Sequence, residues 1–137
     1  MTKETMSGGC LCGAVRYEVT GGVKGCAHCH CRMCQRAAGA PVVTWFTVTG
    51  DHFRVTQGAL KFRNSSDLAE RGFCGDCGTQ IAFRYLKDAG KSIDVTAASL
   101  DDPEAMPPSF QIWVGSRPSW MHGFDAELPE RKGTTEN

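Results

Sequence analysis

Residues 8–19 read GGCLCGAVRYEV, and this stretch decides the fold. It places the C-x-C pair Cys10 and Cys12 between glycines, directly before a segment in which apolar and polar residues alternate. Alternation with a period of two is typical of a β-strand with one buried face. A pair of thiols at the entry to a strand is typical of one half of a metal site. These residues therefore predict a β-protein held together by a metal ion.

The other half of that site lies far along the chain. Residues 74–78 read CGDCG, a C-x-x-C motif that precedes another alternating segment. Two cysteine pairs from distant parts of a chain can close one tetrahedral zinc site. A redox C-x-x-C pair usually opens a helix in a βαβ unit, and neither feature is evident here. We expect Arg71 to offset the charge of the site. The predicted ligands of this structural zinc are Cys10, Cys12, Cys74 and Cys77.

A third group of ligands, residues 26–34, reads CAHCHCRMC and offers more than one metal ion needs. Its compact core is Cys29, Cys31 and Cys34, which can hold one face of a zinc ion and leave the fourth position open, as in catalytic sites. A fourth protein ligand would close the site and make it structural. The alternatives for that ligand are Cys26, His28 and His30. Zinc with three thiolates activates water poorly and suits a soft incoming sulfur, so the pattern favours a thiol substrate.

Short alternating segments and turns make up most of the remaining chain. The segments that we expect to form strands are residues 14–19, 42–49, 53–55, 60–62, 80–85, 93–95 and 111–114. One short helix is expected at residues 31–38. Trp45 and Trp113 fall on predicted strands, and we expect both in the core. The pattern predicts one mainly β domain of antiparallel sheets with minimal helix over residues 5–130, and a disordered C-terminal tail at residues 131–137.

The composition narrows the classes of partner. Lysine and arginine together number 15, as do aspartate and glutamate, so the formal net charge is zero. A protein that neutralises phosphates usually has a basic excess, so we expect no nucleic-acid partner. No apolar run approaches the ~18 residues that span a bilayer, and the first residues do not resemble a signal peptide. We therefore expect a cytoplasmic protein with no membrane partner, in which eight cysteines point to metal rather than to disulfides.

Together these motifs resemble the glutathione-dependent formaldehyde-activating enzymes (GFA) and their relatives, which include centromere protein V. The matching segments are residues 8–17, 29–36, 39–41, 71–79, 112–114, 118–120 and 127–129. The resemblance implies a β-tent fold of small antiparallel sheets with two zinc ions per chain. It places the structural zinc on the four cysteines named above and a catalytic zinc on Cys29, Cys31 and Cys34.

The resemblance also implies an activity. The family is associated with carbon–sulfur lyase chemistry, the reversible addition of the glutathione thiol to formaldehyde that gives S-hydroxymethylglutathione. Glutathione is then the small-thiol partner, and Cys26, His28 and His30 are not ligands, although both histidines are candidates to line the site. Relatives often have a histidine where this chain has Gln111, a difference that bears on the substrate. Two other functions fit the sequence: a non-catalytic zinc-binding interaction module, and a thiol/zinc redox sensor.

Overall fold

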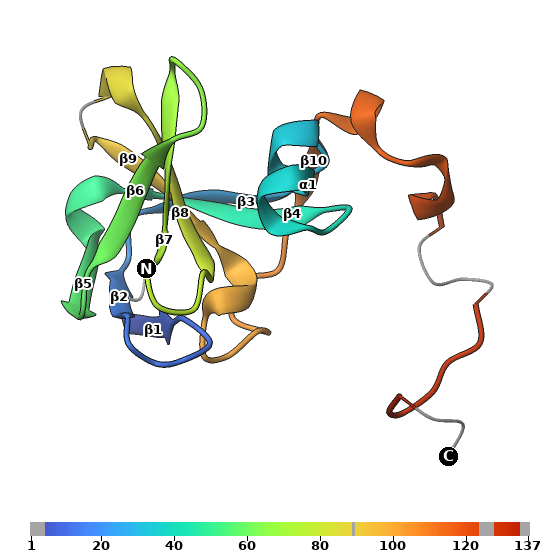
Figure 1. Cartoon of the computed structure of the whole chain (residues 1–137), viewed down its shortest axis with the longest axis horizontal. Coiled ribbons are helices and arrows are strands. Elements are labelled where there is room, and N and C mark those ends of the chain that lie inside the picture. Colours follow the sequence, from blue (N-terminus) through green and yellow to red (C-terminus); the bar gives the residue numbers. More distant parts are fainter. Residues whose placement is uncertain (1–4, 89, 124–127, 135–137) are drawn as a thin grey trace.

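The computed structural model describes residues 5–88, 90–123 and 128–134. These residues form a mainly β structure with one α-helix, as the sequence predicts (Figure 1). The strands are β1 (Thr5–Gly9), β2 (Arg16–Thr20), β3 (Val23–Cys29), β4 (Val43–Thr49), β5 (Phe53–Gln57), β6 (Leu60–Asn64), β7 (Ala69–Cys74), β8 (Gln80–Tyr85), β9 (Ser92–Thr96) and β10 (Phe110–Ile112). The α-helix is α1 (Arg32–Ala38), and single 3-10 turns lie at Gly50–His52, Leu86–Asp88, Ala97–Ser99, Val114–Ser116 and Ser119–Met121.

The strands form two sheets. A small sheet has the order β1-β2-β5, and a larger one has the order β10-β3-β4-β9-β8-β7-β6. Both are antiparallel except at one edge, where β10 runs parallel to β3. The sheets are thus mostly antiparallel, as predicted, with this one parallel pairing at the edge. Parallel neighbours need a long connection, and β3 and β10 are joined through residues 30–109. The last part of this connection, residues 97–109, carries the chain from the end of β9 back to the β3 edge.

The main core lies where the two sheets face each other. Tyr17 and Val19 of β2 are buried in one cluster with Phe46 of β4 and Ile81 of β8. The Tyr17 hydroxyl reaches the Ser99 hydroxyl at 2.7 Å, which satisfies its polar end. Gly8 is required beside this pair, since a Cβ there would stand 2.4 Å from the Tyr17 oxygen. The glycines before Cys10 therefore let β1 approach the core closely.

Helix α1 begins and ends where the sequence predicts. Cys31 is its N-cap residue, and its sulfur accepts a hydrogen bond from the Cys34 N–H at 3.3 Å. Gly39 ends the helix in the left-handed conformation, with φ of 65°. Gln35 is buried, and its Nε2 donates to the carbonyl oxygens of His30 (2.7 Å) and Ser116 (3.2 Å). This side chain ties the helix to the end of β3 and to the segment after β10.

Several sequence-based expectations for strands were incomplete. The predicted strands correspond to β2, β4, β5, β6, β8, β9 and β10, whereas β1, β3 and β7 were missed because glycine and cysteine interrupt their apolar pattern. Trp45 is buried, as predicted. The prediction for Trp113 is wrong: β10 ends at Ile112, and Trp113 is left-handed with φ of 58° and 67% exposed. A strand ends there because that backbone conformation cannot continue the β-ladder.

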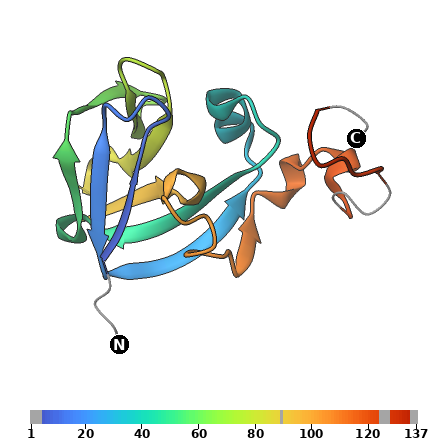
Figure 2. The same cartoon turned by 90° about the horizontal axis from the view of Figure 1, so that it is seen from below.

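The C-terminal segment leaves the sheets after β10 (Figure 2). It contains the turns Val114–Ser116 and Ser119–Met121. Residues 124–127, which include the Glu127 of the family-like signature, and residues 135–137 lie outside the described residues. The domain boundary at residue 130 and the disordered tail therefore stay predictions. Nowhere in the described ranges does a helix have the length and apolar character to cross a membrane.

Candidate metal centres

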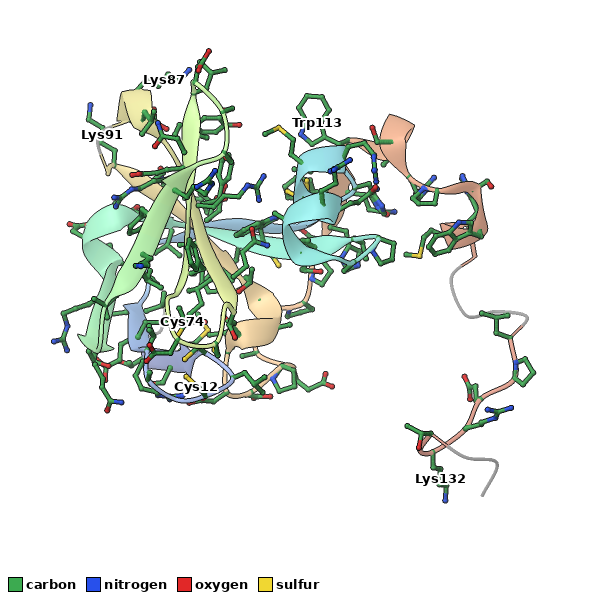
Figure 3. The ribbon with its side chains drawn as sticks, in the orientation of Figure 1. Cys12, Cys74, Lys87, Lys91, Trp113 and Lys132 are labelled. Carbon is green, nitrogen blue, oxygen red and sulfur yellow. The ribbon has the colours of Figure 1, made fainter. Side chains whose placement is uncertain are left out.

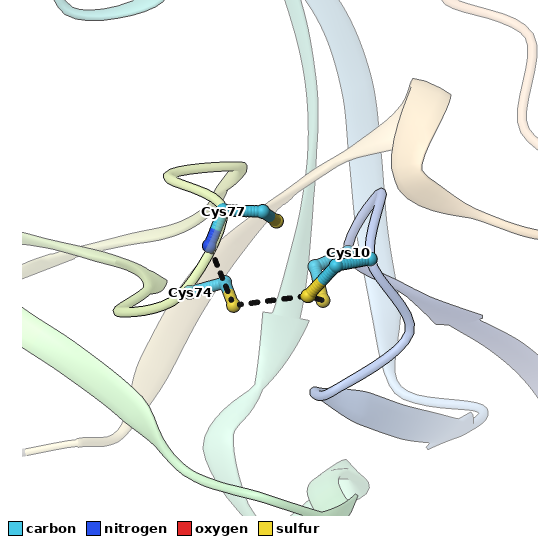
Figure 4. A group of neighbouring side chains, drawn as sticks. Cys10, Cys74 and Cys77 are labelled. Carbon is cyan, nitrogen blue, oxygen red and sulfur yellow. Dashed lines mark hydrogen bonds between the residues drawn. The ribbon is translucent and has the colours of Figure 1, made fainter.

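The first group of thiols joins two loops that are far apart in the sequence. Cys10 and Cys12 lie between β1 and β2, and Cys74 and Cys77 lie at the end of β7 and in the loop to β8 (Figures 3 and 4). The four sulfurs all lie within 4.8 Å of one another. All four are free thiols. We call this group the four-cysteine cluster.

The geometry of the four-cysteine cluster fits the predicted zinc ion. Four sulfurs bound at about 2.3 Å to a tetrahedral zinc ion stand roughly 3.8 Å apart. Here the sulfurs of Cys10 and Cys12 are 3.6 Å apart, and those of Cys12 and Cys74 are 3.8 Å apart. The spacing of these thiols therefore matches the demands of a four-coordinate site.

Backbone amides point at the sulfurs of the four-cysteine cluster. The Val15 N–H donates to the Cys10 sulfur at 3.2 Å. The N–H groups of Asp76 and Cys77 donate to the Cys74 sulfur at 3.4 and 3.5 Å. The hydrogen bond from Val15 lowers the pKa of Cys10. The Val15 amide thus favours the thiolate of Cys10, the form that binds a metal ion.

The second group of thiols comes from one short segment. Cys29 ends β3, Cys31 caps α1, and Cys34 lies in the first turns of the helix. Their sulfurs lie within 4.8 Å of one another, and those of Cys29 and Cys34 are 3.6 Å apart. In the ranges that the structure describes, no fourth histidine, cysteine or carboxylate joins them. We call this group the three-cysteine cluster.

Arg71 lies against the three-cysteine cluster. Both of its terminal nitrogens, Nη1 and Nη2, donate to the Cys34 sulfur, at 3.7 and 3.6 Å. Arg71 is buried, and Nη1 also donates to Gln80 Oε1 at 3.1 Å. The prediction that Arg71 serves the four-cysteine cluster is therefore wrong. β7 pairs with β6 without a register shift, so Arg71 and Cys74, three residues apart, point to opposite faces of the strand.

These contacts shift the pKa values of Cys34 and Cys29 in opposite directions. Hydrogen bonds from the Cys29 thiol, and then from Cys31 and Arg71, lower the pKa of Cys34 to about 5. The same contact with Cys34, together with burial, raises the pKa of Cys29. Cys34, beside the buried guanidinium, therefore loses its proton before Cys29 does.

The remaining candidate ligands are engaged elsewhere. Cys26 belongs to the main core, and its thiol donates to the Met106 carbonyl at 3.4 Å. His28 Nδ1 lies 2.7 Å from the Thr44 hydroxyl, and the buried His30 Nε2 lies 2.8 Å from Gln111 Oε1. Neither histidine lines the cavity beside the three-cysteine cluster, contrary to the expectation from the resemblance. On β3, His28 points away from the face that carries Ala27 and Cys29, because side chains alternate along a strand.

A cavity of about 550 Å³ adjoins the three-cysteine cluster, and all three of its cysteines line the cavity. Most of the wall is apolar, and its residues come from β3, α1 and strands β4 and β7 to β10, together with the loops that join them. One carboxyl group, that of Asp94, also faces the cavity and accepts a hydrogen bond from the Thr47 hydroxyl. Burial raises the pKa of Asp94. Sequence reasoning missed this wall, although the alternation in β8 puts Phe83 and Tyr85 on one face.

The family comparison agrees with this arrangement. The profile of the glutathione-dependent formaldehyde-activating enzyme family matches residues 5–116, most of the chain. The chain belongs to this family. Both clusters fall inside the matched region, so the cysteines that could bind metal belong to the part of the chain that matches the family.

Individual relatives are more distant. A protein of Schizosaccharomyces pombe named as an uncharacterized lyase is 30% identical over 78 residues, which are 57% of this chain and 56% of that protein. The chain thus spans a little over half the length of this curated relative. The crystal structure of a Rhodobacter sphaeroides protein matches with a TM-score of 0.61 and 26% identity, over 77% of this chain and 99% of that one.

Proposed function

We propose that this protein is a zinc-dependent carbon–sulfur lyase of the GFA type, which acts on adducts of a small thiol with formaldehyde or a related small aldehyde. In the forward direction the thiol sulfur bonds to the carbonyl carbon, the C=O π bond breaks, and the thiol proton ends on the new hydroxyl oxygen. The lyase direction reverses each of these changes. Glutathione, named in the description of the family, is the first thiol to test.

One observation carries this proposal: three thiols share a cavity, and no fourth ligand side chain joins them in the described part of the chain. Catalytic zinc sites keep one coordination position for water or substrate, whereas structural sites are closed by four protein ligands. A binding module without catalysis would need a fourth protein ligand here. The three-cysteine cluster is therefore the proposed catalytic site, and the four-cysteine cluster the proposed structural site.

The residues around the three-cysteine cluster have separate tasks in this proposal. A zinc ion held by Cys29, Cys31 and Cys34 would supply a soft Lewis acid that favours a thiolate as its fourth ligand. The Arg71 guanidinium donates to the Cys34 sulfur and offsets the negative charge of the three thiolates. Trp45 exposes apolar surface to the cavity and excludes water from the reacting carbon.

The test is turnover of the zinc-loaded protein and of Cys31→Ser. The serine keeps an N-cap oxygen for α1 and removes one proposed ligand, so the helix is retained while the second zinc equivalent is lost. Formation of the hydroxymethyl adduct from formaldehyde and a thiol, followed by NMR above the uncatalysed rate, should fall by at least about 100-fold. Metal analysis should show two zinc ions in the wild type and one in the variant.

Cys26→Ala is the control, since it removes a cysteine of the same sequence segment that lies outside both clusters. It should keep both zinc ions and the wild-type rate. The proposal is wrong if Cys31→Ser keeps the second zinc ion and turns over thiol and formaldehyde at the wild-type rate.

A further inference from the structure

The exposed apolar side chains of this protein gather at the cavity beside the three-cysteine cluster. Among the described residues, eleven large apolar side chains are exposed, and six of them line this cavity. These six are Met33, Leu68, Tyr85, Phe110, Ile112 and Trp113. Apolar surface concentrated in one place marks a binding site, whereas scattered apolar residues are ordinary. The cavity volume of about 550 Å³ is typical of a small-molecule site.

One wall of the cavity is a row of aromatic rings. The rings of Trp45 and Phe83 lie 6.1 Å apart between centroids, and those of Phe83 and Tyr85 lie 5.1 Å apart in an edge-to-face arrangement. Trp45 belongs to β4 and the other two to β8, so the row crosses the large sheet. Rings fixed in this way offer a preformed surface for another ring.

Trp113 forms another wall of the cavity and directly follows β10, the edge strand beside β3. Its backbone lies in the left-handed region, which is rare for a bulky residue, and its indole is 67% exposed (Figure 3). Backbone strain of this kind persists where a structure needs a side chain in one place, and it gathers at ligand sites. An exposed indole in a strained conformation at a cavity fits a substrate wall better than a core residue.

The three cations that line this cavity, Lys24, Arg32 and Arg71, donate to hydroxyl, amide and thiol groups. Arg71 donates to Cys34 and Gln80 and stacks 5.0 Å from the centre of the Phe83 ring. Arg32 donates to Gln35 Oε1, and Lys24 Nζ donates to the Ser92 hydroxyl at 2.8 Å. Glutathione carries two carboxylates and no ring, so it would engage the polar side of the cavity and leave the aromatic row and Trp113 without a partner.

We infer that the thiol which this site prefers carries an apolar ring, bound with its ring between the aromatic row and Trp113. This inference rests on the proposed function and narrows its thiol to a chemical class. The sulfur faces the three-cysteine cluster, and the ring occupies the apolar part of the cavity. Trp113 is then a residue that determines specificity.

Calorimetric titration of the zinc-loaded protein tests the inference, with phenylmethanethiol and glutathione as the two probes. Burial of a phenyl ring should make phenylmethanethiol bind at least about tenfold more tightly than glutathione. Trp113→Ala should weaken phenylmethanethiol about fivefold and leave glutathione unchanged. Trp113→Phe keeps a ring and should retain most of the affinity. Trp120→Ala is the control, because Trp120 is equally exposed but does not line the cavity.

The outcomes separate this inference from the proposed function. If both thiols react with formaldehyde but glutathione binds as tightly as phenylmethanethiol, or if Trp113→Ala changes neither affinity, the inference is wrong while the lyase proposal stands. Phenylmethanol, which lacks sulfur, tests whether binding needs the thiol. If neither thiol reacts and phenylmethanol binds as tightly as phenylmethanethiol, with the same dependence on Trp113, the lyase proposal fails, and the preference for a thiol fails with it.

Discussion

The two cysteine clusters differ in how the chain assembles them. The four-cysteine cluster joins loops 62 residues apart, whereas the three-cysteine cluster comes from the end of one strand and the start of the helix that follows. The first has four sulfurs and the second has three sulfurs and a cavity. Ligands from distant loops fix the relative positions of two sheets. Ligands from one short segment can hold a metal ion from one side only, and that leaves room for a substrate.

The clusters also differ in how their negative charge is balanced. Backbone N–H groups of Val15, Asp76 and Cys77 point at sulfurs of the four-cysteine cluster. At the three-cysteine cluster a buried guanidinium, that of Arg71, donates to a sulfur. Backbone donors are fixed by the fold itself, whereas a side-chain donor can be changed by mutation without rebuilding a loop. The two sites should therefore respond to different substitutions.

The largest effect is expected from Cys74→Ala. Cys74 is 1% exposed and should be a ligand of the metal that joins the two loops. Structural zinc contributes on the order of 10 kcal/mol to folding, so the variant should lose its cooperative thermal transition and both zinc ions. Cys26→Ala removes an equally buried cysteine outside the clusters and should cost only about 1 kcal/mol. Circular dichroism melts and zinc analysis would measure both. Equal stability of the two variants would contradict the proposed structural role.

A smaller, local effect is expected from Arg71→Gln. Without the guanidinium, the thiolates of the three-cysteine cluster lose their cationic partner, and zinc affinity at that site should fall about 10- to 100-fold. Competition with a chromophoric chelator would measure this loss, and the four-cysteine cluster should keep its metal. Arg84→Gln is the control, since Arg84 on β8 pairs with Glu70 (2.7 Å) and stacks on Phe62 without reaching a cysteine. Equal zinc affinity in the two variants would show that Arg71 does not serve the metal site.

The smallest effect is expected at the Asp94 carboxyl. Burial raises its pKa above the ordinary value of 3.8, so its ionised form destabilises the folded protein at neutral pH. Asp94→Asn should therefore be slightly more stable than the wild type at pH 7.5, and the advantage should shrink as the pH falls toward 3.8. The ionised form of Asp101 instead stabilises the folded protein, because the hydrogen bond from Arg16 lowers its pKa. Asp101→Asn should slightly weaken the protein at pH 7.5. Urea unfolding at several pH values would test both signs.

Much of the metal chemistry could be predicted from the sequence because ligand type and spacing are local properties. The C-x-C and C-x-x-C motifs, the three-cysteine cluster, and the helix from Cys31 to Gly39 could all be inferred from adjacent residues. The partner of Arg71 could not. It depends on which side chains of β7 share a face of the sheet. That strand reads AERGFC and shows no alternating apolar pattern from which the faces could be assigned. Because β7 was not predicted, Arg71 was assigned to the wrong cysteine cluster.

Trp113 shows a second limit of sequence reasoning. Its neighbours Gln111, Ile112 and Val114 suggest a strand that continues through it, and a tryptophan on such a strand is usually buried. The turn at Val114–Ser116 instead begins directly after it. The Ser116 N–H donates to the Trp113 carbonyl and the Arg117 N–H to the Val114 carbonyl. Which backbone conformation a residue adopts at the end of a short edge strand depends on what the next residues contact, and no local pattern records that.

The distance between the two halves of the four-cysteine cluster also has a consequence for the order of folding. The entropy lost on closing a loop grows with the logarithm of its length, so ligands within one short segment meet far more readily than ligands 62 residues apart. Cys29, Cys31 and Cys34 can thus collect an ion while the chain is still unfolded, before strands β7 and β8 have formed. The three-cysteine cluster, the proposed catalytic site, would then be the first to hold metal, and the four-cysteine cluster, the proposed structural site, would be the last.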